Sequence, residues 1–222
     1  MKEVPSLIVM LTYNDKTVKN ASEIFEQCKN SKATYWGFKE KPLPHEEMKK
    51  LFAEMKACGK TTVLEVVEYT EDEGLAGAKA AAEFGCDILM GTVYSDAIND
   101  FCKENGLRYM PFVGKVTERP SVLDGTAQEI IGQASELLKK GVYGFDLLGY
   151  RFTGDQSGLI ERFVGEIKAP VCVAGSVDSL GKLDELKKTS PKFFTVGSAF
   201  FENKFGDDFA SQIDTVCDYI KK

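Results

Sequence analysis

Short apolar runs alternate with longer amphipathic segments along the chain. The apolar runs have no polar face, which is typical of parallel strands that are covered on both sides. The segment after each run carries apolar residues at three- and four-residue intervals, as in a helix packed against a sheet. The predicted strands are residues 6–12, 33–38, 61–68, 86–91, 108–113, 142–147, 171–174 and 193–196.

This repeated strand–helix pattern predicts an α/β fold, a (β/α)8 TIM barrel of eight parallel strands. The length of 222 residues is close to the ~250 typical of such a barrel. Right-handed crossovers would close the strands into a ring. No linker or change in composition divides the chain, so residues 1–222 are predicted to form a single barrel domain. An open doubly wound sheet is the alternative, and the lack of a Gly-x-Gly-x-x-Gly motif after the first strand disfavours it.

Two of the predicted strands end in the same dipeptide, Gly175-Ser176 and Gly197-Ser198. Glycine has no Cβ, so an anion can approach the backbone N–H groups closely. A helix beginning just beyond would add the positive end of its dipole. The ends of strands seven and eight are where many TIM barrels bind phosphate. These four residues are therefore predicted to bind phosphate.

Composition narrows the possible partners. The net charge of −6 argues against general binding to nucleic acid or anionic membranes, and no apolar run approaches the ~20 residues of a membrane span. The six cysteines are widely spaced and the N-terminus lacks a signal-peptide pattern, so we expect a reduced, cytoplasmic protein. A single histidine, His45, excludes sites built on several histidines. We predict no metal and no cofactor, and assembly into a homo-oligomer stays open.

The ends of the other predicted strands supply candidate catalytic residues. Lys39 follows strand two, and Glu65 and Glu68 come from strand three. A lysine and a carboxylate in a barrel mouth could transfer a proton next to a carbonyl, or the lysine could form a Schiff base. Glu65 and Glu68 are three positions apart, so only one of them can face the interior of a regular strand. A solvated charge or an internal salt bridge is the alternative explanation for either glutamate.

Asp146 interrupts an otherwise apolar strand and is a further candidate catalytic residue. A buried carboxylate needs a partner, and Lys115 or Arg151 is expected to provide it. A buried structural ion pair is the alternative. Lys41, Lys115 and Arg151 are the predicted substrate-binding residues.

Through the two Gly-Ser strand ends and its overall layout, the chain resembles the ribulose-phosphate-binding group of TIM barrels. The run Lys39-Glu40-Lys41, with Gly91 and Asp96, is similar to part of the thiamine-phosphate synthase pattern. Lys39 and the run Gly59-Lys60-Thr61 resemble glycerol-phosphate-responsive antiterminator proteins.

These observations lead to one main hypothesis and two alternatives. The first is an enzyme that acts on a small phosphorylated sugar or related metabolite by proton transfer next to a carbonyl, as an isomerase, epimerase, lyase or aldolase. The second is a sensor that binds such a metabolite without turnover. The third is a thiamine-phosphate-synthase-like transferase, which would require Mg²⁺ held by carboxylates such as Asp96.

Overall fold

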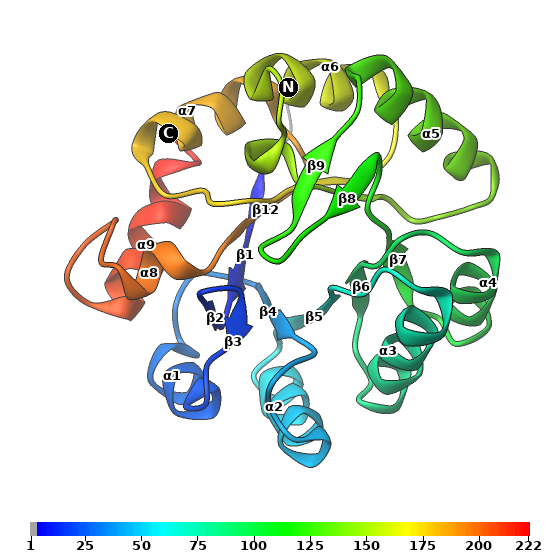
Figure 1. Ribbon diagram of the computed structural model, residues 1–222. Helices are drawn as coiled ribbons and strands as arrows, with labels where there is room; N and C mark the ends of the chain where they lie inside the picture. Colours follow the sequence, from blue (N-terminus) through cyan, green and yellow to red (C-terminus); the bar gives the residue numbers. More distant parts are fainter. Residues whose placement is uncertain (1–3) are drawn as a thin grey trace.

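Eight parallel strands form one sheet in the order β10–β11–β12–β1–β4–β5–β6–β7, with helices around the outside (Figure 1). The computed structural model describes residues 4–222. The strands of this sheet are β1 (Ser6–Met10), β4 (Tyr35–Lys39), β5 (Thr61–Val66), β6 (Ile88–Gly91), β7 (Arg108–Met110), β10 (Phe145–Leu147), β11 (Val171–Val173) and β12 (Phe193–Val196). The helices are α1 (Ala21–Cys28), α2 (His45–Ala57), α3 (Glu71–Glu83), α4 (Asp96–Glu104), α5 (Ala127–Lys139), α6 (Gln156–Glu166), α7 (Leu180–Thr189), α8 (Ser198–Phe201) and α9 (Phe209–Tyr219), with a short 3-10 helix η1 at Gly149–Arg151.

The two outer strands of this order, β7 and β10, close the sheet into a barrel. The backbone N–H of Asp146 donates to the carbonyl of Pro111 at 3.0 Å, and Phe112 and Asp146 form a parallel bridge. The N–H of Tyr143 donates to the carbonyl of Tyr109, also at 3.0 Å. The predicted TIM barrel is therefore confirmed, and the open sheet is excluded.

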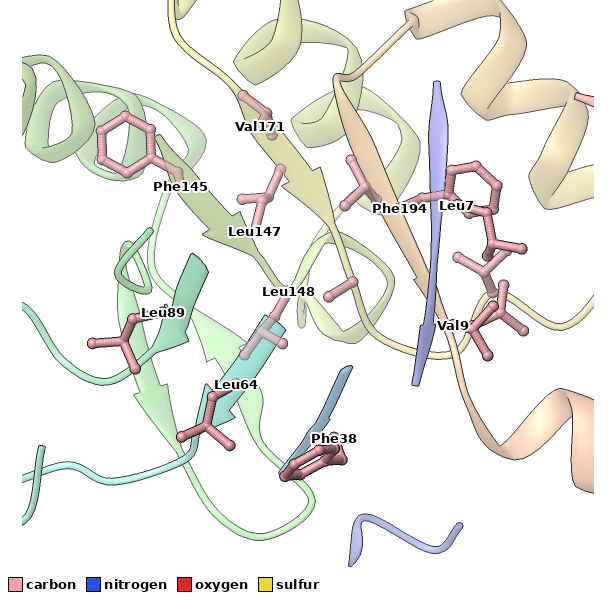
Figure 2. Packing of buried hydrophobic residues seen from close by; sticks show 14 of the residues in the cluster. Leu7, Val9, Phe38, Leu64, Leu89, Phe145, Leu147, Leu148, Val171 and Phe194 are labelled. Carbon is pink, nitrogen blue, oxygen red and sulfur yellow. The ribbon is translucent and has the colours of Figure 1, made fainter. Parts of the chain in front are cut away.

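Alternation along the strands separates two apolar cores. The larger core lies between strands and helices and includes Phe38, Leu64, Phe145 and Leu147 (Figure 2). A smaller cluster fills the barrel with residues from several strands: Ile8, Met10, Val63, Ile88, Met90, Met110, Cys172 and Phe193. Because neighbouring residues of a strand face opposite sides, the residues next to Phe38, Leu64 and Phe145 face the interior. Lys39, Glu65 and Asp146 thus come to lie inside the barrel.

Two hairpins at the carboxyl ends of the strands were not predicted. The first strand ends at Met10 rather than at residue 12, and β2 (Thr12–Tyr13) pairs with β3 (Lys16–Thr17). After the fifth strand of the barrel, β8 (Lys115–Thr117) and β9 (Val122–Asp124) pair as a hairpin whose turn contains residues 118–121. Its Leu123 carbonyl accepts a hydrogen bond from the N–H of Thr153 at 3.0 Å, which ties the hairpin to the loop after β10. Strands of two or three residues have too little periodicity to be recognised in a sequence.

None of the helices in residues 4–222 has the length and apolar character needed to cross a bilayer.

Candidate functional site

A pocket of about 150 Å³ opens at the carboxyl ends of the strands, between the loops that follow β11 and β12. Both Gly-Ser dipeptides line it, together with charged residues from four other segments. Its lining residues are Met10, Thr12, Asp15, Lys39, Glu65, Leu148, Arg151, Ala174, Gly175, Ser176, Val177, Asp178, Thr195, Gly197, Ser198, Ala199 and Glu202. The two dipeptides predicted to bind phosphate therefore face one common space.

The backbone around the Gly-Ser pairs explains the residue types. Gly175 has φ +99°, and a Cβ there would lie 2.8 Å from the Cγ of Arg151. A Cβ at Gly197 would lie 2.6 Å from the hydroxyl oxygen of Thr12. Ser176 also has a positive φ of 73°, which is uncommon outside glycine. The chain can thus approach Arg151 and Thr12 closely only where the Cβ is missing.

The sequence predicts that a helix begins just beyond each Gly-Ser dipeptide, and only one of the two helices does so. Helix α8 begins at Ser198, directly after Gly197, but it has only four residues. Helix α7 begins at Leu180, and the hydroxyl of Ser179 already accepts the N–H of Lys182 at its first turn. The N-terminus of α7 therefore does not follow Ser176 directly, and the loops themselves form this part of the pocket.

Lys39 is the cation at the base of the pocket, and 8% of its surface is exposed. Its Nζ donates to Asp15 Oδ1 at 2.6 Å and lies 3.5 Å from Glu65 Oε1. Arg151 Nη1 lies 3.4 Å from the same Asp15 oxygen. Burial lowers the pKa of Lys39, but the carboxylates of Glu65 and Asp15 outweigh burial, so the pKa lies above its ordinary value. Lys39 is therefore a charged ammonium at neutral pH.

Asp146 is fully buried, as predicted, but its predicted partner is missing. Neither carboxylate oxygen has a hydrogen-bond partner among the described residues. Burial raises the pKa of Asp146 well above its ordinary value, and the charge of Glu65 raises it further, while Lys39 and Arg151 act in the opposite direction. The expectation of a hydrogen bond to Lys115 or Arg151 was wrong, and the raised pKa of Asp146 favours its neutral form, which costs less to bury than a carboxylate.

The alternation of β5 decides between the two candidate glutamates. Glu65 is on the strand, faces the interior and lines the pocket beside Lys39. Strand β5 ends at Val66, so Glu68 belongs to the following loop. Glu68 does not line this pocket; it is paired with Lys41 and with Arg119, whose Nη2 lies 2.7 Å from Glu68 Oε2.

Three other residues considered from the sequence lie outside the pocket. Lys115 begins the β8–β9 hairpin and is exposed, because the chain turns away from the barrel before reaching it. Asp96, the expected Mg²⁺ ligand, lies on α4 and pairs with Lys140 at 2.7 Å. His45 lies at the outer start of α2, where its Nε2 is 3.4 Å from Glu83 Oε2 and its ring contacts Phe84. Within residues 4–222, no group of three or more His, Cys, Asp or Glu residues is arranged to hold a metal ion.

Two charged residues, one in the pocket and one paired with Glu68 beside it, were missed in the sequence. Asp15 lies in the turn between β2 and β3 and has φ 65°. Arg119 lies in the β8–β9 turn. Both are ordinary turn residues in sequence, and only their place in the loops after the first and fifth predicted strands could have drawn attention to them.

The fold and site define a TIM barrel with a charged pocket at the carboxyl ends of its strands. No known family model matches the chain, and no curated protein matches it. Solved structures with the same fold include orotidine 5'-phosphate decarboxylase from Pyrococcus horikoshii (14% identity, TM-score 0.71, covering 97% of this chain and 99% of that one). Thiamine phosphate pyrophosphorylase from Pyrococcus furiosus is a second such structure, with 15% identity and a TM-score of 0.67 over 98% of this chain and 96% of that one. A third is a 4-hydroxy-2-oxoglutarate/deoxyphosphogluconate aldolase, with 10% identity and a TM-score of 0.68 over 96% of this chain and 94% of that one. At these identities the similarity establishes the fold, which agrees with the resemblance to phosphate-binding barrels.

Proposed function

We propose that this protein is an enzyme that moves a proton next to the carbonyl of a small phosphorylated metabolite. The observation that carries the proposal is the placement of Lys39 and Glu65 in the same pocket as both Gly-Ser dipeptides. The names of the three structural neighbours each include a phosphorylated compound. This agreement supports a phosphorylated substrate, while the reaction is argued from the residues alone.

The phosphate group would bind at the Gly175-Ser176 and Gly197-Ser198 loops. Their backbone can come close to an anion because glycine has no side chain, and charge-assisted hydrogen bonds to N–H groups are stronger than neutral ones. Arg151 lines the same space and adds a positive charge. Bound in this way, the phosphate would hold the rest of the substrate against the Lys39 end of the pocket.

Lys39 and Glu65 would then divide the chemistry between them. The ammonium of Lys39 would polarise the carbonyl oxygen, and the carboxylate of Glu65 would remove a proton from the adjacent carbon. The C–H electron pair becomes the new C=C bond, the carbonyl π electrons move to oxygen, and Lys39 stabilises the resulting negative charge. For isomerisation, Glu65 would return the proton to the former carbonyl carbon, while the hydroxyl proton on the deprotonated carbon passes to the former carbonyl oxygen. For epimerisation, water would protonate the original carbon on the face opposite Glu65, and Glu65 would release its proton to solvent. The charged state of Lys39 disfavours the Schiff-base route, which needs a neutral amine.

Solvent deuterium exchange tests this function directly. Phosphorylated ketoses and aldoses of three to six carbons would be incubated with the protein in D₂O and followed by proton NMR. We expect the C–H signal next to the carbonyl to disappear for at least one substrate, and Glu65→Gln to slow this loss by roughly 10²–10⁴-fold. Glu136→Gln, on the exposed face of α5, is the matched control.

Two results would redirect the proposal. Binding of a sugar phosphate without exchange by the parent protein would favour the sensor. Equal exchange by the parent and Glu65→Gln would remove Glu65 from the mechanism. The transferase alternative loses Asp96 as its expected Mg²⁺ ligand, because that carboxylate is paired with Lys140 outside the pocket.

A further inference from the structure

A second hollow of about 450 Å³ adjoins the pocket on its Lys39 side. Asp15 and Lys39 line both spaces, so the two meet at the Lys39–Asp15 contact. The second hollow lies between the loop after β4, the loop after β5 and the β8–β9 hairpin. A ligand whose phosphate is at the Gly-Ser loops could therefore extend past Lys39 into this space.

Glu68 holds two cations at the wall of the second hollow. Its side chain is 6% exposed, whereas Lys41 and Arg119 are 65% and 47% exposed. One carboxylate oxygen of Glu68 pairs with Lys41 and the other with Arg119. Burial raises the pKa of Glu68, but the two cations outweigh it and the pKa lies below its ordinary value. The group thus combines one negative and two positive charges, with the positive ones accessible to solvent.

Arg119 is also fixed from a second side. Its guanidinium lies over the ring of Tyr69, 5.2 Å from the ring centroid. The Tyr69 hydroxyl donates to the Glu118 carbonyl at 2.6 Å and is 2.8 Å from the Ser121 hydroxyl. The guanidinium is therefore oriented before any ligand arrives, which reduces the entropy lost on binding. An ammonium carries three N–H donors and a guanidinium five, more than the contacts with Glu68 require.

The other carboxylates in this hollow are engaged with the protein. Asp15 accepts from Lys39, the Glu40 carboxylate accepts from the Val67 N–H at 3.2 Å, and Glu73 accepts from the Thr70 hydroxyl at 2.6 Å. An entering anion would thus meet three further cations that line the hollow: Lys16 on β3, and Lys41 and Arg119, which Glu68 holds together.

We infer that Lys41 and Arg119, anchored by Glu68, bind a second anionic group at the end of the substrate opposite its phosphate. The substrate class is then a small carbonyl compound with an oxyanion at both ends, either two phosphates or a phosphate and a carboxylate. The inference rests on the proposed function, since it takes the Gly-Ser loops as the site of the first phosphate. It also gives Glu68, a candidate catalytic residue in the sequence, the role of positioning the two cations.

Matched ligand pairs test this inference by titration calorimetry. Ribulose 5-phosphate and ribulose 1,5-bisphosphate differ by one phosphate, and glycerol 3-phosphate and 3-phosphoglycerate differ by one carboxylate. We expect the doubly anionic member of at least one pair to bind about tenfold more tightly, with a gain that shrinks as salt is added. The pair that shows the gain identifies the second group as phosphate or carboxylate.

Variants assign the gain to the two cations. Lys41→Gln and Arg119→Gln should each remove most of the affinity gained from the second anionic group, while changing the affinity for the singly anionic ligand less than twofold. Lys139→Gln on α5 and Arg162→Gln on α6 make the same charge changes on exposed helix surfaces and should keep the gain. Thermal melting of each variant establishes that it is folded.

The outcomes separate this inference from the proposed function. Tight binding of a singly anionic ligand, with no gain in either pair, would overturn the inference and leave the proposed function standing. A gain that survives in Lys41→Gln and Arg119→Gln would also overturn it. Failure of the parent protein to bind any of the four ligands would overturn the inference, and the deuterium-exchange test would then decide separately whether the proposed function stands.

Discussion

The Nζ of Lys39 donates to Asp15 Oδ1 at 2.6 Å, and this contact joins the end of β4 to the β2–β3 turn. Together with Glu65 it places two carboxylates around one buried ammonium. Asp15 therefore keeps Lys39 charged and in place, and it lies between the pocket and the second hollow.

Removing the Asp15 charge should lower the pKa of Lys39. In Asp15→Asn, burial continues to favour the neutral amine, while one of the two carboxylates that oppose it is lost. Reductive ¹³C-methylation followed by NMR titration would measure the Lys39 pKa in both proteins. Asp100→Asn, at an exposed position on α4, is the control. An unchanged Lys39 titration in Asp15→Asn would contradict the assigned role.

Asp146 should make the parent protein lose stability as the pH rises. The folded state binds the proton of Asp146 more tightly than the unfolded chain does, because its folded pKa is raised. This contribution is complete below the unfolded pKa of ~3.9 and is lost as the pH rises toward the folded pKa. Asp146→Asn cannot ionise, so its stability relative to the parent should increase between pH 4 and pH 8. Urea unfolding at several pH values measures this, and a constant difference would show that Asp146 does not titrate abnormally.

Gly197 and Ser176 should respond differently to substitution, although both line the pocket. In Gly197→Ala the new methyl group would meet Thr12, so we expect a loss of about 1–3 kcal/mol in the free energy of unfolding. Ser176 already has the left-handed backbone that glycine adopts easily, so Ser176→Gly should change stability by less than ~1 kcal/mol. Binding of inorganic phosphate should survive in Ser176→Gly, since the backbone N–H remains. Loss of phosphate binding in a fully stable Ser176→Gly would show that the hydroxyl is the essential contact.

Cys58 should be the thiol that reacts rapidly in the native protein. It is exposed at the end of α2, whereas Cys28, Cys86, Cys102, Cys172 and Cys217 are buried. Burial raises the pKa of Cys28 to about 11 and that of Cys86 to about 12, which suppresses the reactive thiolate. With Ellman's reagent at pH 8 we expect one fast equivalent, with the rest released by urea. Cys58→Ser should remove the fast equivalent, and a second fast thiol in the native protein would contradict the packing of the helices on the barrel.

The sequence by itself determined the barrel. Buried parallel strands must be apolar on both faces, and the helices between them must carry an apolar stripe. The order of strands and helices can therefore be predicted from the spacing of apolar residues. It also determined that Gly175 and Gly197 lie at strand ends, since barrel topology brings the ends of neighbouring strands together. The strand alternation that points Lys39 and Asp146 inward follows from the same periodicity.

The tertiary structure alone decided which charges meet. Glu65 and Glu68 look equivalent in sequence, and only the end of β5 at Val66 separates the residue that faces Lys39 from the one that holds Lys41 and Arg119. Asp15 and Arg119 reach their sites through short hairpins whose pairing depends on turns, and turns of two to four residues carry no periodic pattern. Side-chain contacts between residues far apart in the chain depend on distances of a few ångströms, which hydrophobic periodicity does not encode.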